Sequence, residues 1–513
     1  MKFKALYIGS REITIQLMTD GYFYTEKTYD IYIEDKYYAS TNKVVSSIYH
    51  LEPEKDYRIG ISEQGKQPIE YQKITTKYED ISLDVRQFGA KGDGISDDTI
   101  SIQAAIMSCP KDGRITIPKG IYKVSALFLK SDICIELEEG AVLSGIIDRE
   151  KKPILPGKVK TSDPNSEYAL STWEGEAMDC FAALLNGIHV KNVTITGLGK
   201  IDGCASYENW WSDEWKKSHR PRLVYFNRCS NIIMQGITVM NSPSWTIHPY
   251  LCSKCKFLDL SIYNPKVSPN TDGLNPESSN NIEIVGVKFS VGDDCIAIKS
   301  GKKSNVVVAT SHIRISHCFM ENGHGAVTIG SENAGGVFDV KVLNSEFHKT
   351  DRGLRIKTRR GRGKKAIVDG IFFNKIKMDN VLSPITGNMF YFCDFDGHSD
   401  YVQNRSALPV DDGTPEIGTL EFKNIVCKDS HVSGIYFVGL PEKKIKKIVL
   451  KNVTISFHEN AVTGLPIMAD YIMETSKCGV HIENVKEVQL ENVKIREYEG
   501  EQYSFIHVDR ILN

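Results

Sequence analysis

A short apolar triplet recurs at steps of about 23 to 31 residues through much of this 513-residue chain. The copies are Ile237-Thr238-Val239, Leu260-Ser261-Ile262, Val287-Lys288-Phe289, Cys318-Phe319-Met320, Ser345-Glu346-Phe347, Ile376-Lys377-Met378, Val453-Thr454-Ile455 and Val493-Lys494-Ile495. A period of this length is typical of solenoids. Because no copy is followed by apolar residues at helical spacing, each repeat is predicted to be an all-β coil. The sequence therefore predicts an all-β fold, a parallel β-helix.

The coils of a β-helix must stack, because a single coil cannot bury its own inner face. The open end of the stack needs a cap, and residues 98–107 form the one convincing amphipathic helix pattern. Asp97 or Asp98 is placed to cap the N-terminus of that helix. We expect the helix to cover the first coil and the β-helix to occupy residues 81–513.

The N-terminal part of the chain has a different pattern. Residues 1–77 alternate apolar and polar side chains in short runs, as in Glu12 to Leu17, which is typical of half-buried antiparallel strands. The segment Leu51 to Tyr57 is similar to the tyrosine corner of β-sandwich domains, in which the Tyr hydroxyl bonds to upstream backbone. We predict a fibronectin type III-like β-sandwich over residues 1–80.

Composition excludes some classes of partner and site. With 63 Lys plus Arg against 65 Asp plus Glu, the net charge of -2 gives no reason to expect nucleic acid or an anionic membrane as partner. No window approaches the ~20 apolar residues of a membrane span, and residues 1–11 lack the apolar core of a secretory signal. The 12 cysteines lie mostly singly in apolar runs, and Cys252 and Cys255 form a lone CxxC pair. We therefore expect buried thiols rather than disulfides or a zinc site, and a cytoplasmic protein.

Polar motifs follow one another at the length of a coil. They are Asn270-Thr271-Asp272-Gly273, Gly292-Asp293-Asp294-Cys295, Gly323-His324-Gly325 and Arg355-Ile356-Lys357. Their separations of about 21, 31 and 31 residues predict that they stack on one face of the solenoid. Glycosidic cleavage needs such groups, because one carboxylic acid protonates the leaving oxygen and one carboxylate directs water. Crowding also raises the pKa of one carboxyl, which keeps it protonated near neutral pH.

Each motif taken alone has a simpler explanation. Asn-Thr-Asp-Gly is usually a turn, an Asp pair often lies on a solvated loop, and His324 between glycines fits a tight turn. The run from Arg352 to Lys365, with eight basic residues in fourteen, is more often a solvated face. Adjacent strand residues also face opposite ways, so Asp293 and Asp294 can share a site only at a bend, which Gly292 favours. Only the common register of the motifs favours a catalytic site.

In this order and at these spacings, the motifs resemble the signatures of glycoside hydrolase family 28, the polygalacturonases. The segment Asp84 to Gly94 is similar to the start of pectin-active β-helices, and Pro118 to Tyr122 and Ile201 to Gly203 fit as well. The resemblance runs from Asp84 to near the C-terminus. It implies a right-handed, pectin-lyase-like parallel β-helix that uses no cofactor and no metal.

The resemblance also implies roles for the motif residues. Asp293 would be the general acid, Asp272 and Asp294 would position the attacking water, and His324 would support the acid. The reaction would be hydrolysis of α-1,4-galacturonosidic bonds, with inversion at the anomeric carbon. The expected partner is an oligogalacturonide or a related pectic oligosaccharide.

Substrate contacts are expected from a second group of residues. Arg355 and Lys357 would hold the carboxylate of the sugar at the cleavage site, since Arg can bind a carboxylate in bidentate fashion. Tyr391 would be their aromatic partner. Asn270, Lys299 and Arg352 are included as further substrate-binding residues.

Some features resemble the bacterial exo-acting members of the family. These are the segment Gly330 to Val337 and the fibronectin-like first domain. The insertion from Gly203 to Arg222 carries Trp210, Trp211 and Trp215, which either close one end of the groove or pack at its rim. We expect the enzyme to release galacturonic acid from a chain end.

Other functions are compatible with the same fold. A calcium-dependent pectate lyase would use acidic residues as oxygen ligands. A rhamnogalacturonan or xylogalacturonan hydrolase would differ only in substrate, because fold does not fix it. A non-catalytic carbohydrate-binding β-helix would need none of the chemistry. The separate His and Arg-Ile-Lys coils favour hydrolysis.

Overall fold

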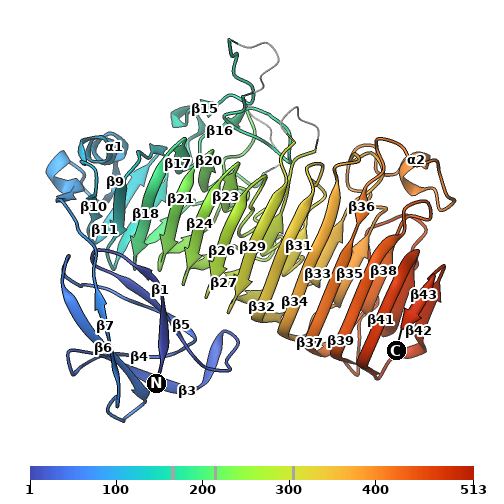
Figure 1. Ribbon diagram of the computed structural model, residues 1–513. Helices are drawn as coiled ribbons and strands as arrows, with labels where there is room; N and C mark the ends of the chain where they lie inside the picture. Colours follow the sequence, from blue (N-terminus) through green and yellow to red (C-terminus); the bar gives the residue numbers. More distant parts are fainter. Residues whose placement is uncertain (163–167, 213–216, 303–306, 513) are drawn as a thin grey trace.

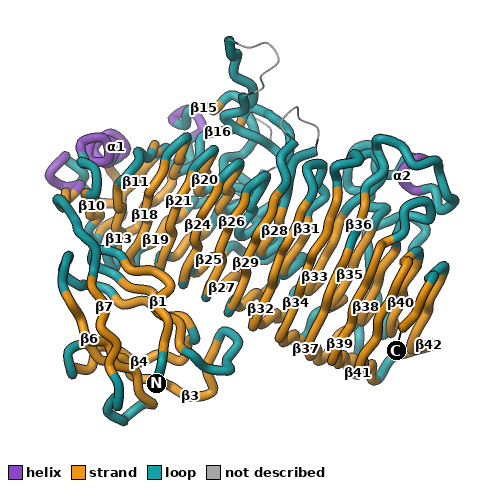
Figure 2. The backbone as a smooth tube through the Cα atoms, viewed as in Figure 1, coloured by secondary structure: helices purple, strands orange, loops and turns teal. Residues whose placement is uncertain are grey.

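The computed structural model describes residues 1–162, 168–212, 217–302 and 307–512, which form a β-sandwich followed by a long parallel β-helix (Figure 1). Strands dominate, and helices within the described ranges are short (Figure 2). They are the α-helices α1 (Thr99–Ser108) and α2 (Asp400–Gln403) and the 3-10 helices η1 (Val85–Phe88) and η2 (Arg149–Lys151). None of the described helices is long and apolar enough to cross a membrane.

The sandwich consists of two antiparallel sheets. One has the order β1 (Phe3–Ile8), β2 (Ile13–Leu17), β5 (Val45–Ile48), and the other has the order β4 (Lys36–Lys43), β3 (Tyr24–Ile33), β6 (Asp56–Glu63), β7 (Tyr71–Thr75). Apolar side chains of both sheets, including Ile15 and Ile59, are fully buried between them. The hydroxyl of Tyr57 accepts a hydrogen bond from the backbone N–H of Glu52 at 2.8 Å, which confirms the predicted tyrosine corner.

The β-helix has one long sheet that runs along the solenoid and shorter sheets on the remaining face. The strands of the long sheet are β8 (Ser82–Asp84), β9 (Asp93–Asp97), β10 (Gly113–Ile117), β11 (Gly120–Val124), β13 (Ile133–Leu137), β14 (Ala141–Gly145), β18 (Lys191–Gly197), β19 (Lys200–Asp202), β21 (Ser230–Gln235), β22 (Thr238–Met240), β24 (Ser253–Leu258), β25 (Ser261–Tyr263), β26 (Asn280–Val285), β27 (Lys288–Ser290), β29 (Thr310–Ser316), β30 (Phe319–Glu321), β32 (Val337–His348), β34 (Ile367–Asp379), β36 (Glu416–Ile417), β37 (Thr419–Ser430), β39 (Ile445–Phe457), β41 (Val485–Arg496) and β43 (Arg510–Leu512).

The shorter sheets form the face of the β-helix that carries the candidate active site. They are β12 (Leu127–Phe128), β17 (Leu185–Ile188), β20 (Val224–Asn227) and β23 (Ile247–Tyr250), and then β28 (Ile296–Ile298), β31 (Val327–Ile329), β33 (Arg352–Lys357), β35 (Ser383–Asn388), β38 (Ser433–Val438), β40 (Cys478–Glu483) and β42 (Glu499–Ile506). A small antiparallel pair, β15 (Ile154–Leu155) and β16 (Cys180–Phe181), lies outside the coils.

The predicted triplets stack in one parallel ladder. Their central residues pair in the order Thr238, Ser261, Lys288, Phe319, Glu346, Lys377, Val426, Thr454 and Lys494. The ladder contains one coil that the repeat pattern missed, at Ile425-Val426-Cys427. A long excursion between β35 and β37, which includes α2, separates this copy from the preceding one and obscures the period.

Inward-facing apolar residues stack in the same way and form the core. One such column pairs Cys255, Ile282, Ile313, Val340, Ile371, Leu420, Ile448 and Val488 in register. All of these side chains are fully buried. Since burial of apolar surface contributes ~25 cal/mol per Å², each coil is stabilised by the neighbours above and below it.

Helix α1 covers the first coil, as predicted, with Ile102, Ala105 and Ile106 buried in the core of the β-helix. The capping side chain is Asp97, which accepts a hydrogen bond from the Thr99 N–H at 3.0 Å. Asp98 makes no capping bond to the helix. Its carboxylate accepts hydrogen bonds from the backbone N–H groups of residues 91 and 92 and fixes the preceding turn.

The sandwich is fastened to the first coils by a buried charge cluster. The guanidinium of Arg114, on β10, is fully buried. It donates to Glu12 of the sandwich at 2.9 Å, to Glu79 of the connecting segment at 2.7 Å and to Glu136 of the next coil at 2.9 Å. A separate, small apolar contact centred on Val45 joins β5 to later coils at Leu258 and Val285. The cluster therefore joins both parts of the fold at one cation.

We expect Arg114→Ala to lower the free energy of unfolding by ~3–5 kcal/mol, because the change leaves buried carboxylates without their counter-charge. Urea unfolding followed by tryptophan fluorescence measures the loss. Arg510→Ala is the matched control, since Arg510 is two-thirds exposed in its pair with Glu487 and should matter little. Equal stability of the two variants would contradict a stabilising role for the cluster.

Candidate active site

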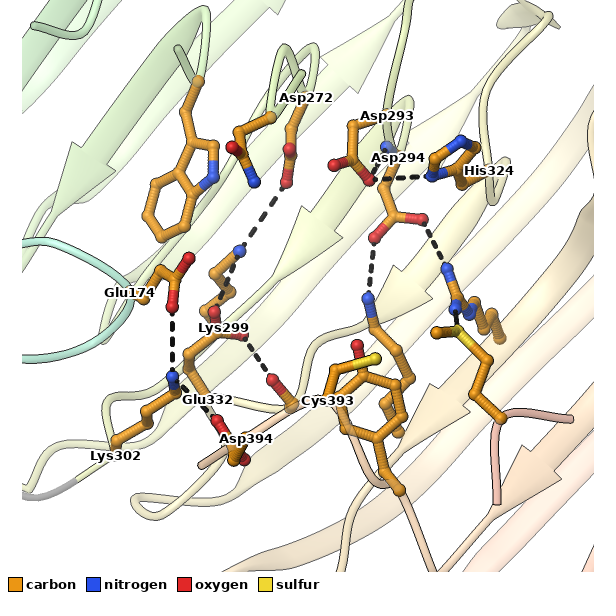
Figure 3. A pocket seen from close by; sticks show the side chains of 17 residues that line it. Glu174, Asp272, Asp293, Asp294, Lys299, Lys302, His324, Glu332, Cys393 and Asp394 are labelled. Carbon is orange, nitrogen blue, oxygen red and sulfur yellow. Dashed lines mark hydrogen bonds and ion pairs between the residues drawn. The ribbon is translucent and has the colours of Figure 1, made fainter. Parts of the chain in front are cut away.

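A cavity of about 230 Å³ lies on the outer face of the sheet that begins with β28 (Figure 3). Its walls are almost entirely polar and charged. The lining residues are Glu174, Trp245, Asn270, Asp272, Asp293, Asp294, Lys299, Lys302, His324, Ser331, Glu332, Arg355, Lys357, Tyr391, Cys393, Asp394 and Met468. The cavity is smaller than the ~300–1,000 Å³ of pockets for drug-sized ligands, so it suits a small polar group.

The coil register brings the predicted motifs together. Leu274 pairs with Ile296, Ile296 with Val327, and Val327 with Leu354, and each of these residues directly precedes or closely follows one of the motifs. The four motifs therefore lie on adjacent coils. All four motifs contribute side chains to the cavity. The stacking that the spacing predicted is therefore confirmed.

The neighbouring residues Asp293 and Asp294 both reach the cavity because the backbone bends before β28. The chain turns at residues 292–293, and the N–H of Asp294 donates to the carboxylate of Asp293 at 2.9 Å. Gly292 permits the bend, since a Cβ at this position would overlap the carbonyl oxygen of Ser268. This geometry resolves the conflict between adjacent residues and strand alternation.

Asp294 is held as a carboxylate by cations from a distant coil. Burial alone would raise the pKa of Asp294, but Lys357 at 3.0 Å and Arg355 at 3.5 Å outweigh it and hold the pKa well below its usual range. These cations lie two ladder steps away, roughly 10 Å along the solenoid axis, so only long side chains can reach. The intervening position is Gly325, where a Cβ would lie 2.8 Å from the carboxylate of Asp294.

Asp272 has the opposite electrostatic character. Burial, followed by the nearby charge of Asp293, raises the pKa of Asp272 to about 7. Its carboxyl accepts a hydrogen bond from the side-chain amide of Asn275 at 2.7 Å and lies 3.6 Å from the ammonium of Lys299. The crowding of carboxyls therefore does raise one pKa, and the carboxyl that carries the proton in the unliganded site is Asp272.

His324 accompanies Asp293 on the open side of the cavity. Its Nδ1 lies 3.5 Å from the carboxylate of Asp293, and its side chain is half exposed. The hydrogen bond to Asp293 raises the pKa of His324. The imidazole of His324 can therefore stabilise the carboxylate form of Asp293. The contact weakens when Asp293 is neutral.

The remaining predicted residues fall into two groups. Asn270, Lys299 and Tyr391 line the cavity as expected, and the ammonium of Lys357 lies 5.6 Å from the ring centre of Tyr391. Arg352 is not among the lining residues, and its role as a substrate contact stays a prediction. Its guanidinium donates to the carbonyl of Leu465, and burial lowers its pKa to about 10.

One end of the cavity is closed by an ion-paired bridge between three loops. We call this bridge the clasp, and it consists of Glu174, Lys302 and Asp394 (Figure 3). The ammonium of Lys302 lies 3.3 Å from the carboxylate of Glu174 and 2.9 Å from that of Asp394. The loops that carry the clasp show no repeat, so sequence periodicity could not find it.

The tight turn that carries Glu174 is fixed by backbone contacts. The N–H of Lys302 donates to the carbonyl of Gly175 at 3.1 Å. Gly175 has φ +80°, and a Cβ there would lie 2.8 Å from the nitrogen of Lys302, so glycine is required on both counts. Trp173 anchors the turn from behind by stacking on the ring of His219, with 4.7 Å between ring centres.

The tryptophans of the insertion at residues 203–222 pack at the rim. Trp210 is buried in a cluster with Phe181, and Trp211 donates from its indole to the carbonyl of Ser242 at 3.0 Å. Neither lines the cavity, and Trp215 lies outside the described residues. The insertion instead acts through Arg220, which donates to the side-chain oxygen of Asn270 at 2.6 Å.

Such a fold and site define a class, the β-helical carbohydrate-active enzymes in which clustered carboxyls lie on one outer face. More narrowly, the chain belongs to glycosyl hydrolases family 28, whose profile matches residues 114–459. A second profile, rhamnogalacturonase A/epimerase, pectate lyase-like, matches residues 82–140. The protein is therefore a glycoside hydrolase with a right-handed parallel β-helix.

Individual relatives agree with the family. A protein of Arabidopsis thaliana named "probable polygalacturonase" is 30% identical over 390 residues, which cover 75% of each chain. The structure of the family 28 exopolygalacturonase of Yersinia enterocolitica is similar with a TM-score of 0.73 at 19% identity, covering 100% of this chain and 98% of that one. The exopolygalacturonase of Thermotoga maritima gives a TM-score of 0.64 at 25% identity, covering 82% and 92%.

Proposed function

We propose that this protein is an exo-acting hydrolase of α-1,4-galacturonosidic bonds that releases galacturonic acid from short pectic oligosaccharides. The observation that carries the proposal is a cavity in which the carboxyls of the two Asp motifs lie with Lys299, Arg355 and Lys357 and whose one end is closed by the clasp. A cavity closed at one end accepts a chain terminus, whereas an open groove accepts an internal unit. Relatives named polygalacturonase and exopolygalacturonase support the substrate and the mode of attack.

The residues are suited to an inverting displacement. Asp293, on the open side with His324, would protonate the leaving oxygen, and Asp272 and Asp294 would hold the water that attacks the anomeric carbon. Asp294 is held ionised by its cations and can accept a hydrogen bond from that water. Burial and the neighbouring charge of Asp293 raise the pKa of Asp272, so Asp272 brings a proton into the cavity that Asp293 also lines.

The sugar carboxylate would be bound by Arg355 and Lys357. Both cations already share the charge of Asp294, and both line the cavity. A second carboxylate can join them because a guanidinium has donors left after one contact. Tyr391, stacked near Lys357, would cover the ring of the same sugar.

We also propose a division into a fibronectin type III-like domain at residues 1–80 and a catalytic domain at residues 81–513. The strand orders β1-β2-β5 and β4-β3-β6-β7, together with the tyrosine corner, support the first assignment. A cytoplasmic location, with imported short chains as substrate, is supported by the 12 cysteines, all of which are free thiols.

The mode of attack can be tested on a long, unesterified galacturonan. We expect the monosaccharide to dominate the earliest products, and NMR of the first product should show the inverted anomer. Chromatography of a time course checks the first point. A spread of intermediate oligomers without dominant monomer would contradict exo attack while leaving the hydrolase assignment standing.

We expect Asp293→Asn to lower kcat by ~10²–10⁴, the usual effect of losing general acid catalysis, while binding of the oligosaccharide is retained. Initial rates and calorimetric titration measure the two quantities. Asp412→Asn serves as the matched control, because this exposed aspartate lies outside the cavity and pairs only with Lys364 at the surface. Near-normal turnover of a folded Asp293→Asn protein would remove Asp293 from the mechanism.

The rate should also depend on pH in a defined direction. Below a pH of about 7 the carboxyl of Asp272 keeps its proton, and above that pH the proton is lost. We expect this proton to be needed when Asp293 protonates the leaving group, so kcat/KM should fall as pH rises through about 7. A kcat/KM that instead rises through this range would show that the proton on Asp272 is inhibitory and would overturn this role.

A further inference from the structure

A buried carboxylate at the closed end of the cavity has no part in the chemistry described so far. Glu332 is 6% exposed, and its carboxylate lies 3.4 Å from the ammonium of Lys299. Burial would raise the pKa of Glu332, but Lys299 and Lys302 outweigh it and lower the pKa to about 2. With Glu174 and Asp394 of the clasp, Glu332 makes this end of the cavity rich in anionic oxygen acceptors.

The carboxylates at this end already pair with the cations beside them, chiefly Lys299 and Lys302, so a sugar carboxylate would have to compete for the same cations. This end is suited to the uncharged edge of the sugar, since carboxylates accept hydrogen bonds from hydroxyl groups and such charge-assisted bonds are the strong ones. The sugar carboxylate must then turn towards Arg355 and Lys357 on the other side. The charges therefore fix the orientation of the terminal unit.

The contacts also indicate which chain end is bound. Lys299 joins the two halves of the site, because its ammonium lies 3.6 Å from Asp272 and 3.4 Å from Glu332. Asp272 is one of the two residues proposed to hold the attacking water, so the sugar whose anomeric carbon is attacked lies against Glu332. The proposed acid, Asp293, lies with His324 on the open side, where the leaving part of the chain would be.

We propose that Glu332 accepts a hydrogen bond from the 4-hydroxyl of the terminal unit and so restricts the enzyme to chains with a saturated non-reducing end. Chains cut by β-elimination lack this hydroxyl, because the elimination removes the proton at C5 and the oxygen at C4 and leaves a C4=C5 double bond. The enzyme therefore acts on chains that a hydrolase has shortened. It does not accept the new non-reducing ends that a lyase produces. This inference rests on the proposed function.

The expected discrimination is large. A site that is built to bind a substrate hydroxyl rejects the analogue without it by up to ~10⁴–10⁵, because the buried partner is left without a hydrogen bond. Glu332 is buried and ionised, but it keeps its hydrogen bonds from Lys299 and Ser331 when the sugar hydroxyl is absent, so the discrimination should stay below that limit. We expect kcat/KM for the unsaturated substrate to be lower by ~10²–10³.

The experiment compares three trimers at equal concentration: saturated trigalacturonate, its 4,5-unsaturated counterpart, and the saturated trimer with its reducing end converted to an alditol. The saturated trimer and the alditol should be cleaved at similar rates, and the unsaturated trimer should be nearly inert. Cleavage of the unsaturated trimer as fast as the saturated one, or rejection of the alditol alone, would overturn the proposal. If no trimer were cleaved, the proposed function itself would fail.

The variant Glu332→Gln distinguishes recognition of the sugar hydroxyl from a purely structural role of Glu332. The amide keeps the shape but loses the charge, so we expect kcat/KM for the saturated trimer to fall by ~10 to 100-fold. The rate for the unsaturated trimer should change little. The ratio of the rates for the saturated and unsaturated trimers should therefore fall. A merely structural role through Lys299 would lower both rates in parallel and leave the ratio unchanged, which would also overturn the proposal. Glu491→Gln, at an exposed carboxyl paired with Lys451, is the matched control and should change neither rate.

Discussion

The parallel register of the coils is the constraint on which the rest of this structure depends. A hydrogen-bonded ladder does not allow one strand to slide along its neighbour by a fraction of a residue, so one in-register column of core side chains fixes every other column. The column that runs from Cys255 to Val488 is continuous through the site. Residues separated by twenty to thirty positions thereby become neighbours on the outer face without any contact between their own side chains being needed for folding.

The second constraint is charge balance. The site buries several ionised groups, and a buried charge is stable only when it is paired with a group of opposite charge. Lys299 is shared between Asp272 and Glu332, and Lys302 is shared between Glu174 and Asp394. The sharing makes each carboxyl sensitive to its exact neighbours. Asp294, with two cations, is ionised, while Asp272, with one cation that it shares and a nearby carboxylate, has a raised pKa. Burial of similar depth thus accompanies opposite shifts of the pKa.

Periodicity made the solenoid and the catalytic coils predictable from the sequence, because both follow from residues that repeat at coil length. Two features could not be predicted: the coil at Ile425 to Cys427, which the repeat pattern missed, and the clasp. Both depend on long loops between the coils, and these loops do not repeat in the sequence. Glu332 lay within a segment that the sequence had already singled out, yet its burial was not visible there. The position of Arg352 relative to the cavity could not be predicted for a related reason. The direction of a side chain at a strand start depends on the loop that packs against it, here the one that contains Leu465.

The long reach of Arg355 and Lys357 over Gly325 has a consequence for how this fold can change. The ladder step sets a fixed unit of length, roughly 4.8 Å, and the side chains that meet Asp294 already span two such units. A whole coil could be added beyond β42 without altering any of these distances. The same addition between β28 and β33 would move both cations out of range while leaving the hydrophobic core equally well packed. Growth of the solenoid is therefore excluded within the stretch from Asp272 to Lys357, which behaves as an indivisible segment.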